Sequence, residues 1–317
     1  MSSIGIGTSI INVKANIAGC ATVTLKDTAR LIVNEIPPSN QTVTGSTVCS
    51  SDLSANVVIT NTIAGDKYQA YVNNLPIGNF KISDASSTTL ILPTAALGNG
   101  EHIVTVRYQI VGCGEAPLLD TGLVVINQLP SDMLKVFGDT ICGSSDSVQI
   151  TILGTNQKET YQAYKNNTLV GNPVVSKGGD LIISLPVAAI GIGNHRISVR
   201  VNIPGCGTVN LKDSATVLVN PQPKPDLLVK GSTICSTDPS AQVIIFGTKV
   251  GEFYQAYLNN NPIGTLTQSV DTTVTLVLPI ASLTSGLNIV NIRSEVMGCP
   301  SVNLLDTAGV IVNPIPD

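Results

Sequence analysis

Seven cysteines are the residues of this chain whose type and spacing could do chemistry. They stand at alternating intervals of 29 and 64 residues: Cys20, Cys49, Cys113, Cys142, Cys206, Cys235 and Cys299. No C-x-x-C motif occurs, and His102 and His195 are the only histidines. Periodic cysteines without histidine partners indicate disulfides formed in an oxidising compartment, not a zinc site. We therefore expect no metal and no cofactor.

The rest of the sequence keeps the same period of 93 residues. The tetrapeptide Tyr-Gln-Ala-Tyr at 68–71 returns at 161–164 and at 254–257. The repeat predicts the following domains: 1–34 as the last two strands (F and G) of an incomplete repeat, then complete repeats at 35–127, 128–220 and 221–317. Two strands are not stable alone, so either the chain is a stretch of a longer one or another subunit supplies the missing strands.

Short segments of alternating hydrophobicity within each repeat predict an all-β, Greek-key sandwich. In the second repeat the expected strands are 133–140, 148–152, 161–164, 169–170, 181–185, 197–201 and 209–219, with a corner at 186–193. Proline-bearing linkers join the repeats at 34–38, 127–130, 220–225 and 313–316. Because proline favours extended chain, we expect the repeats to form an elongated rod.

Composition narrows the function. Charged residues are 12% of the chain and the net charge is −4, which argues against nucleic-acid binding. No apolar stretch approaches the ~20 residues of a membrane span. No nucleophile–base pair, phosphate loop or carboxylate pair stands out, so the sequence does not predict an enzyme. His102 and His195 recur at one position, but the third repeat has Asn288 there, which argues against a catalytic base.

The expected strands decide between two cysteine pairings. Pairing within a repeat would give Cys49–Cys113, Cys142–Cys206 and Cys235–Cys299. The first cysteine of a repeat, however, lies between strands A and B, and the second in the F–G turn, at opposite ends of strands roughly 25–30 Å long. A disulfide needs Cα atoms within about 7 Å. We therefore favour pairing between repeats, Cys49–Cys206 and Cys142–Cys299; free thiols are the third possibility.

The cysteine motifs also resemble a known family. Gly-Cys follows strand F, as in Gly205-Cys206, and the other cysteine lies in Ser-Thr-Val-Cys-Ser-Ser-Asp (46–52), while the chain closes with Asp-Thr-Ala (306–308) and Val-Asn-Pro-Ile-Pro (312–316). This pattern resembles the immunoglobulin-like repeats of giant Bacteroidota surface proteins, including gliding-motility adhesins. The resemblance covers the whole chain. It implies cell-surface stalks and filaments, and it carries no catalytic residues.

Two further polar features are periodic. A cation and an aspartate 13 residues apart flank each Gly-Cys turn, which predicts cross-strand salt bridges at Lys14–Asp27, Arg107–Asp120, Arg200–Asp213 and Arg293–Asp306. The two tyrosines of each Tyr-Gln-Ala-Tyr motif must point to opposite faces of the strand. We expect one in the core and one exposed, as surface filler or as a contact for a sugar or partner.

We therefore expect a structural stalk or filament segment of a long extracellular adhesin, without catalysis. Its partners would be neighbouring repeats of the same chain or adjacent filament subunits, with a surface glycan or cell ligand at a distal tip. Two alternatives remain open. The repeats themselves could bind carbohydrate or cells, or the chain could polymerise when a neighbour's strands complete the first repeat.

Overall fold

The computed structural model describes residues 4–34, 40–110 and 112–315. Most of the expected linker at 34–38 and the ends of the chain, 1–3 and 316–317, lie outside the described residues. The chain forms two compact units, one of Met1–Pro130 with Asn202–Thr208 and the other of Ser131–Val201 with Val209–Asp317. Strands hold 65% of the residues and helices 4%, which confirms the all-β prediction.

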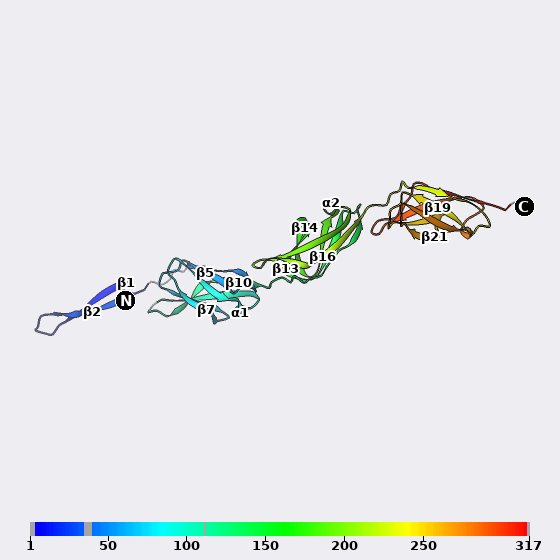
Figure 1. Ribbon diagram of the computed structural model, residues 1–317. Coiled ribbons are helices and arrows are strands. Elements are labelled where there is room, and N and C mark those ends of the chain that lie inside the picture. The colour runs from blue at the N-terminus through cyan, green and yellow to red at the C-terminus, as the bar shows by residue number, and fades with distance from the viewer. Residues whose placement is uncertain (1–3, 35–39, 111, 316–317) are drawn as a thin grey trace. The chain divides into compact units, whose positions relative to one another are not determined.

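The first unit holds an isolated hairpin and one sandwich (Figure 1). In the hairpin, β1 (Gly7–Ala15) pairs antiparallel with β2 (Val23–Val33). The sandwich is built from β3 (Val43–Gly45), β4 (Thr47–Cys49), β5 (Ser54–Thr60), β6 (Lys67–Val72), β7 (Leu75–Ile82), β8 (Ser87–Pro93), α1 (Thr94–Leu97), β9 (Gly100–Gln109) and β10 (Glu115–Asn127). One sheet has the order β3-β5-β8 and the other β4-β10-β9-β6-β7.

The second unit holds most of two further sandwiches. The middle sandwich is built from β11 (Val136–Phe137), β12 (Thr140–Cys142), β13 (Ser147–Lys165), β14 (Thr168–Pro186), α2 (Val187–Ile190), β15 (Gly193–Ile203) and β16 (Gly207–Asn220). The third is built from β17 (Leu228–Gly231), β18 (Thr233–Cys235), β19 (Ser240–Phe246), β20 (Phe253–Leu258), β21 (Asn261–Gln268), β22 (Thr273–Pro279), a 3-10 turn η1 (Ile280–Ser282), β23 (Gly286–Glu295), β24 (Val302–Asn303) and β25 (Ala308–Asn313). Its sheet orders, β17-β19-β22 and β18-β25-β23-β20-β21, repeat those of the first sandwich. This is the Greek-key, immunoglobulin-like order.

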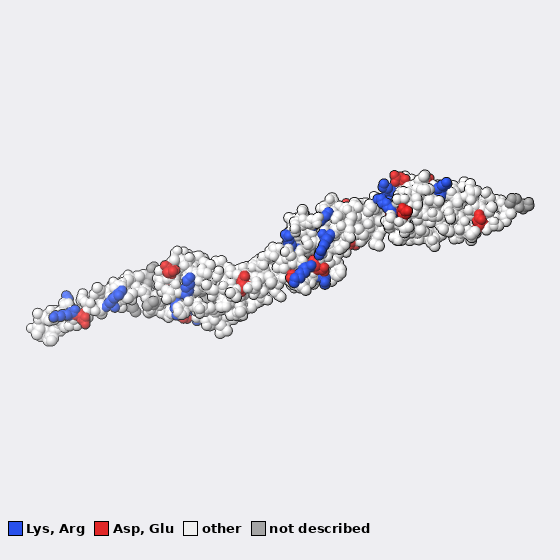
Figure 2. All heavy atoms as spheres, viewed as in Figure 1, with Lys and Arg blue, Asp and Glu red and all other residues white. Residues whose placement is uncertain are grey.

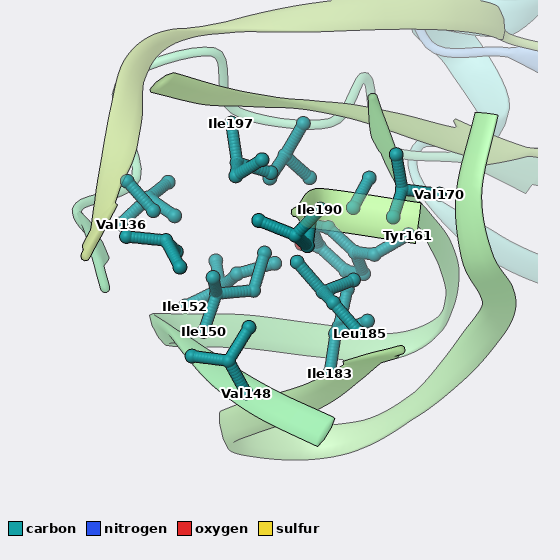
Figure 3. Packing of buried hydrophobic residues seen from close by; sticks show 14 of the residues in the cluster. Val136, Val148, Ile150, Ile152, Tyr161, Val170, Ile183, Leu185, Ile190 and Ile197 are labelled. Atoms are coloured by element: carbon teal, nitrogen blue, oxygen red, sulfur yellow. The ribbon is translucent and has the colours of Figure 1, made fainter. Parts of the chain in front are cut away.

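Alternating side chains form the sandwich cores. Along the first part of β13, Val148, Ile150 and Ile152 are fully buried, while the residues between them face outward. They meet Ile183 and Leu185 of β14, and Figure 3 shows these side chains converging on one interior. Burying each such aliphatic side chain contributes about 1.5–3 kcal/mol. Since the chain has no tryptophan, aliphatic residues supply most of this burial.

The first strand of each sandwich is split, which corrects the single strand expected at 133–140. The chain forms β11, which pairs antiparallel with β13, and then β12, which pairs parallel with β16 at the other edge of the same sheet, whose order is β11-β13-β15-β16-β12. The switch occurs at Gly138, where a Cβ would fall on the backbone oxygen of Thr216. Gly45 and Gly231 occupy the same place in the other sandwiches, because only a glycine lets the two backbones approach so closely.

The middle sandwich also differs from expectation between strands B and C. We expected separate strands at 148–152 and 161–164, but β13 continues through both, because Thr155 and Gln157 also pair with β14. Gly154 and Lys158 take positive φ angles of 68° each and bend this long strand. In the third sandwich the corresponding strands, β19 and β20, are separate.

The glutamine of each Tyr-Gln-Ala-Tyr motif stabilises a β-bulge. The register of β6 against β7 shifts between Tyr68 and Ala70, leaving Gln69 unpaired in that ladder. The Gln69 side-chain amide donates to the carbonyls of Ala70 (3.0 Å) and Ile77 (2.9 Å). Gln162 and Gln255 make the equivalent bonds, so the motif repeats because the bulge repeats.

Candidate functional site

Two disulfides join different sandwiches, and each lies within one compact unit. Cys49 bonds to Cys206 and Cys142 bonds to Cys299, with Cα atoms 4.5 Å apart in both bridges. The structure does not form the bonds within a repeat, and it leaves Cys20, Cys113 and Cys235 unpaired and exposed. These two bridges are the candidate functional site, because they bond one sandwich covalently to another.

Strand pairing places the first cysteine of each bridge. Cys49 ends β4, which runs parallel to β10 and pairs with its last residue, Asn127. Cys49 therefore lies where the first sandwich passes its chain to the next. Cys206 follows β15 in the turn that leads to β16 and so lies at the opposite end of its own sandwich. Cys142 and Cys299 repeat this arrangement, with β12 ending beside Asn220.

A glycine and an asparagine hold the turn that carries the second cysteine against the preceding sandwich. A Cβ on Gly205 would lie 2.9 Å from the backbone of Val48, and one on Gly298 would lie 2.7 Å from the carbonyl oxygen of Thr140. The turn therefore packs backbone to backbone against the preceding sandwich. The Asn127 side-chain amide also donates to the Pro204 carbonyl at 2.8 Å.

The second bridge has the matching hydrogen bond. The Asn220 amide donates to the Met297 carbonyl, also at 2.8 Å. The sequence interpretation missed these asparagines. Their signal was available, because Asn34, Asn127, Asn220 and Asn313 recur at the end of every repeat.

An aspartate fixes the loop after the first cysteine in two of the sandwiches. The Asp52 carboxylate accepts a hydrogen bond from the Cys49 N–H at 2.9 Å, and Asp238 accepts from Cys235 at 2.8 Å. These are turn-capping contacts of a kind common for aspartate. Within 4–34, 40–110 and 112–315, no cluster of three or more histidine, cysteine or acidic side chains could hold a metal ion.

The four predicted salt bridges do not form among the described residues. In the first sandwich Arg107 pairs with Pro117 and Thr105 with Thr121, so Asp120 falls in an irregular stretch of β10. The hairpin β1–β2 is irregular at the same place. Our prediction assumed an unbroken mirror register around each turn. Even without a break, the register of Thr105 with Thr121 would set Leu119 opposite Arg107, and Asp120 would then point to the other face of the sheet.

Each aspartate of a complete sandwich instead ties the first strand to the last. Its carboxylate accepts from the backbone N–H of a strand A residue: Asp120 from Val43 at 2.8 Å, Asp213 from Val136 at 3.2 Å and Asp306 from Val229 at 2.8 Å. The N–H groups of Val136 and Ser214 hold the pKa of Asp213 below its ordinary value, with a smaller contribution from Lys135 at 3.7 Å.

Each arginine instead covers the second tyrosine of the motif. The guanidinium carbon lies over the tyrosine ring in three matching pairs, Arg107 on Tyr71 (4.6 Å), Arg200 on Tyr164 (4.0 Å) and Arg293 on Tyr257 (4.5 Å). The sequence signal for this cation–π contact is the constant spacing of 36 residues between tyrosine and arginine. These tyrosines are half-buried, so one face of each ring is already occupied.

The first tyrosine of each motif is fully buried, and its hydroxyl has a polar partner. Tyr161 donates to the buried Glu159 carboxylate, and Tyr254 donates to Glu252 at 2.5 Å. In the first sandwich Gln41 donates to the Tyr68 hydroxyl at 2.9 Å. Burial raises the pKa of all three tyrosines, and the neighbouring carboxylates raise it further in Tyr161 and Tyr254. These are structural hydrogen bonds in the core.

The two histidines hold the corner before strand F. The Nε2 atom of His102 lies 3.0 Å from the Gly98 carbonyl, and that of His195 lies 3.1 Å from the Gly191 carbonyl. In the third sandwich Asn288 donates to the carbonyl of Thr284 at 2.8 Å and so fills the same place. An amide replaces the imidazole because the position needs a hydrogen bond and no proton transfer.

Charge is sparse on the visible surface. Figure 2 shows isolated basic and acidic side chains on a largely uncharged face. Where charges meet in the middle sandwich, both signs are present, as in the 3.0 Å ion pair of Lys212 with Asp132. None of the helices in the described ranges is long and apolar enough to cross a membrane.

No family model and no curated protein matches this chain. Among solved structures it is similar to a Ca2+-stabilised adhesin with which an Antarctic bacterium binds ice, at 13% identity and a TM-score of 0.34, over 98% of this chain and 82% of that one. It is also similar to the I9–I11 tandem of titin (12%, 0.31, 87% of this chain and 100% of that one) and to a 1.5-MDa bacterial ice-binding adhesin (9%, 0.30, 87% and 98%). At these values the likeness carries no argument about what this chain binds or does.

Proposed function

We propose that this chain is a non-catalytic, force-transmitting segment of an extracellular surface protein, in which disulfides clamp each repeat to the next to make a stalk. The observation that carries the proposal is the bridge geometry. Cys49 and Cys142 each end a first strand, and each bonds to the F–G turn of a different sandwich. A clamp placed where one repeat passes to the next stiffens the linker there.

The chemistry of the bridges supports the location. Disulfides persist in secreted and surface proteins and are rare in reducing compartments. The conserved spacing of 93 residues means that any further repeat of this type would bring cysteines to the same positions. We accordingly propose the repeat boundaries as 35–127, 128–220 and 221–317, with 1–34 as the last two strands of another repeat.

An in-frame deletion in the producing cells tests the stalk. Removing residues 128–220 preserves the period, so Cys49 then meets the turn of Cys299. A stalk predicts fibres shorter by roughly 35–45 Å, one strand length plus a linker, with attachment to a substrate retained. Electron microscopy with a gold-labelled antibody against this segment measures the fibre. The matched control is the same deletion with Cys49→Ser, which removes only the clamp.

Two outcomes of that deletion oppose the stalk. Gold confined to the cell body would exclude a fibre. Loss of attachment after the period-preserving deletion would show that the repeats themselves bind the substrate. The structure offers such binding little support at the tyrosine of each motif, because Arg107, Arg200 and Arg293 already cover one face of those rings.

A second candidate function rests on the hairpin β1–β2. Apolar side chains of both strands are exposed, among them Ile10, Val13 and Val23. If strands of another chain cover this hairpin, the purified chain should form fibres as its concentration rises. Sedimentation velocity should be compared between the 317-residue chain and a chain that lacks residues 1–34. Under polymerisation only the 317-residue chain would assemble, whereas a stalk segment predicts no assembly of either chain.

A further inference from the structure

The two disulfides overlap along the sequence. Cys142 lies between Cys49 and Cys206, and Cys206 lies between Cys142 and Cys299. We propose that these interleaved bridges form a covalent shortcut for tension, so that the fully unfolded chain extends to less than half the length that it would reach without them. This inference rests on the proposed stalk function and adds to it a limit on extension.

Covalent connectivity sets that limit. Three segments connect the two bridges: 49–142 and 206–299, each 93 residue steps long, and 142–206, which is 64 steps long. The shortest route through the chain runs from 1 to 49, crosses to 206, returns to 142, crosses to 299 and continues to 317. It contains 130 residue steps, against 316 in the open chain. At about 3.6 Å per step, full extension falls from about 1,140 Å to about 470 Å.

The shortcut enters the middle sandwich at Cys206 and leaves it at Cys142. Cys206 immediately precedes β16, which begins at Gly207 and ends at Asn220. The partner cysteine of the second bridge, Cys142, ends β12, which pairs in parallel with the last residues of β16. The covalent route between these two cysteines, 142–206, runs through β13, β14, α2 and β15, whereas β16 lies outside it.

A longer array with the same spacing would extend even less. The free Cys235 stands where Cys49 and Cys142 stand in their repeats, and the free Cys113 stands where Cys206 and Cys299 do. If further repeats bridge them, each 29-residue segment such as 206–235 links bridges two repeats apart. Most of that segment is already β-strand, in β16, β17 and β18. A strand rises about 3.3 Å per residue, so stretching it gains only about a tenth in length.

Single-molecule force spectroscopy on the purified 317-residue chain tests the shortcut. Handles are attached at the two termini, and Cys20, Cys113 and Cys235 are replaced by serine in every sample to prevent other pairings. The oxidised chain should reach a contour length of about 470 Å, and the reduced chain about 1,140 Å.

Single-bridge variants give the sharpest result. With Cys49→Ser the remaining bridge Cys142–Cys299 leaves 159 steps, and with Cys299→Ser the bridge Cys49–Cys206 also leaves 159. Both variants should therefore reach about 570 Å. Removing one bridge thus adds only about 100 Å, whereas removing the second adds about 570 Å. Equal small gains from either single removal, with a large gain from the second, distinguish interleaved bridges from sequential bridges, whose gains add, and from nested bridges, whose inner bond adds none.

Other results would overturn the proposal. Pairing within a repeat could leave only Cys142–Cys206 in this serine background, giving 252 steps and about 910 Å. An oxidised chain that extends to that length, or to the length of the reduced chain, contradicts the shortcut. Neither result bears on the stalk, which the deletion in cells tests separately.

Discussion

Replacing Gly205 with alanine tests whether the F–G turn must touch strand β4 for the first bridge to form. A Cβ at this position would lie 2.9 Å from the backbone of Val48, closer than the 3.4 Å of an ordinary contact. Because the neighbouring atoms are backbone, one of the two chain segments must move. Forcing such a group into a packed site typically costs about 1–3 kcal/mol, a factor of roughly 5 to 150 in an equilibrium constant.

The matched control lies two residues away. Gly205 and Gly207 have positive φ angles of 83° and 69°, so alanine strains the backbone at both sites. A Cβ on Gly207, however, meets no atom within 4 Å. The difference between Gly205→Ala and Gly207→Ala therefore isolates the contact with Val48.

The assay is disulfide equilibrium in glutathione buffers, with the three unpaired cysteines replaced by serine. Peptide mapping without reduction quantifies each bridge. We expect Gly205→Ala to lower the equilibrium constant for Cys49–Cys206 by roughly 5- to 150-fold relative to Gly207→Ala. The bridge Cys142–Cys299 should be unchanged in both, which makes it an internal control.

Equal effects of the two alanines on the first bridge would refute this reasoning. Such a result would mean that the turn reaches Val48 loosely and that backbone strain alone controls bridging. A loss of both bridges together would instead indicate that the middle sandwich had unfolded, and far-UV circular dichroism would detect that.

Three further predictions concern single sandwiches. Gly138→Ala should lower the free energy of unfolding, measured in urea, by about 3 kcal/mol, because the new Cβ would fall on the backbone of β16. The control Gly114→Ala places its Cβ in open space and should change the free energy of unfolding little. Equal effects of the two substitutions would contradict the close approach at Gly138. Tyr161→Phe should cost about 1–3 kcal/mol without loss of core volume, because it removes a donor from the buried Glu159 carboxylate. Folding raises the pKa of the Tyr161 hydroxyl, so its contribution to the free energy of unfolding is present below pH 10.0 and is lost as the pH rises beyond that value. The free energy of unfolding of Tyr161→Phe should therefore fall less steeply at alkaline pH than that of the unsubstituted chain. An unchanged alkaline slope would oppose this. Folding lowers the pKa of the Asp213 carboxyl, so its contribution to the free energy of unfolding is present above pH 3.8 and is lost as the pH falls. In Asp213→Asn the free energy of unfolding should therefore fall less steeply as the pH becomes acidic. A drop of the same size at every pH would contradict a role of the carboxylate charge.

Much of the fold follows from local patterns that a sequence displays directly. Alternation such as that of Val148, Ile150 and Ile152 places strands because side chains in a strand point to opposite faces in turn. The period of 93 residues and the Tyr-Gln-Ala-Tyr motifs predicted repeated sandwiches, and the all-β fold is confirmed. Opposite faces for the two tyrosines also follow from this period-2 geometry.

Register was the point at which sequence reasoning failed. The salt-bridge prediction set Arg107 opposite Asp120, but the register of Thr105 with Thr121 differs from that pairing by one residue. Arg107 instead lies over the ring of Tyr71, and the Asp120 carboxylate accepts a hydrogen bond from the Val43 N–H. Such partners lie far apart in sequence, so local patterns do not reveal them.

Local patterns in the sequence predicted the repeat, the candidate cysteines and most of the strands, because these depend on near neighbours in the chain. Only the tertiary structure decided what depends on close approach. Gly138 lets the first strand change its pairing partner from β13 to β16, and Gly205 lets a turn reach Val48 beside Cys49. Whether two backbones can approach within contact distance is set by the packing of whole sheets, which no single segment encodes.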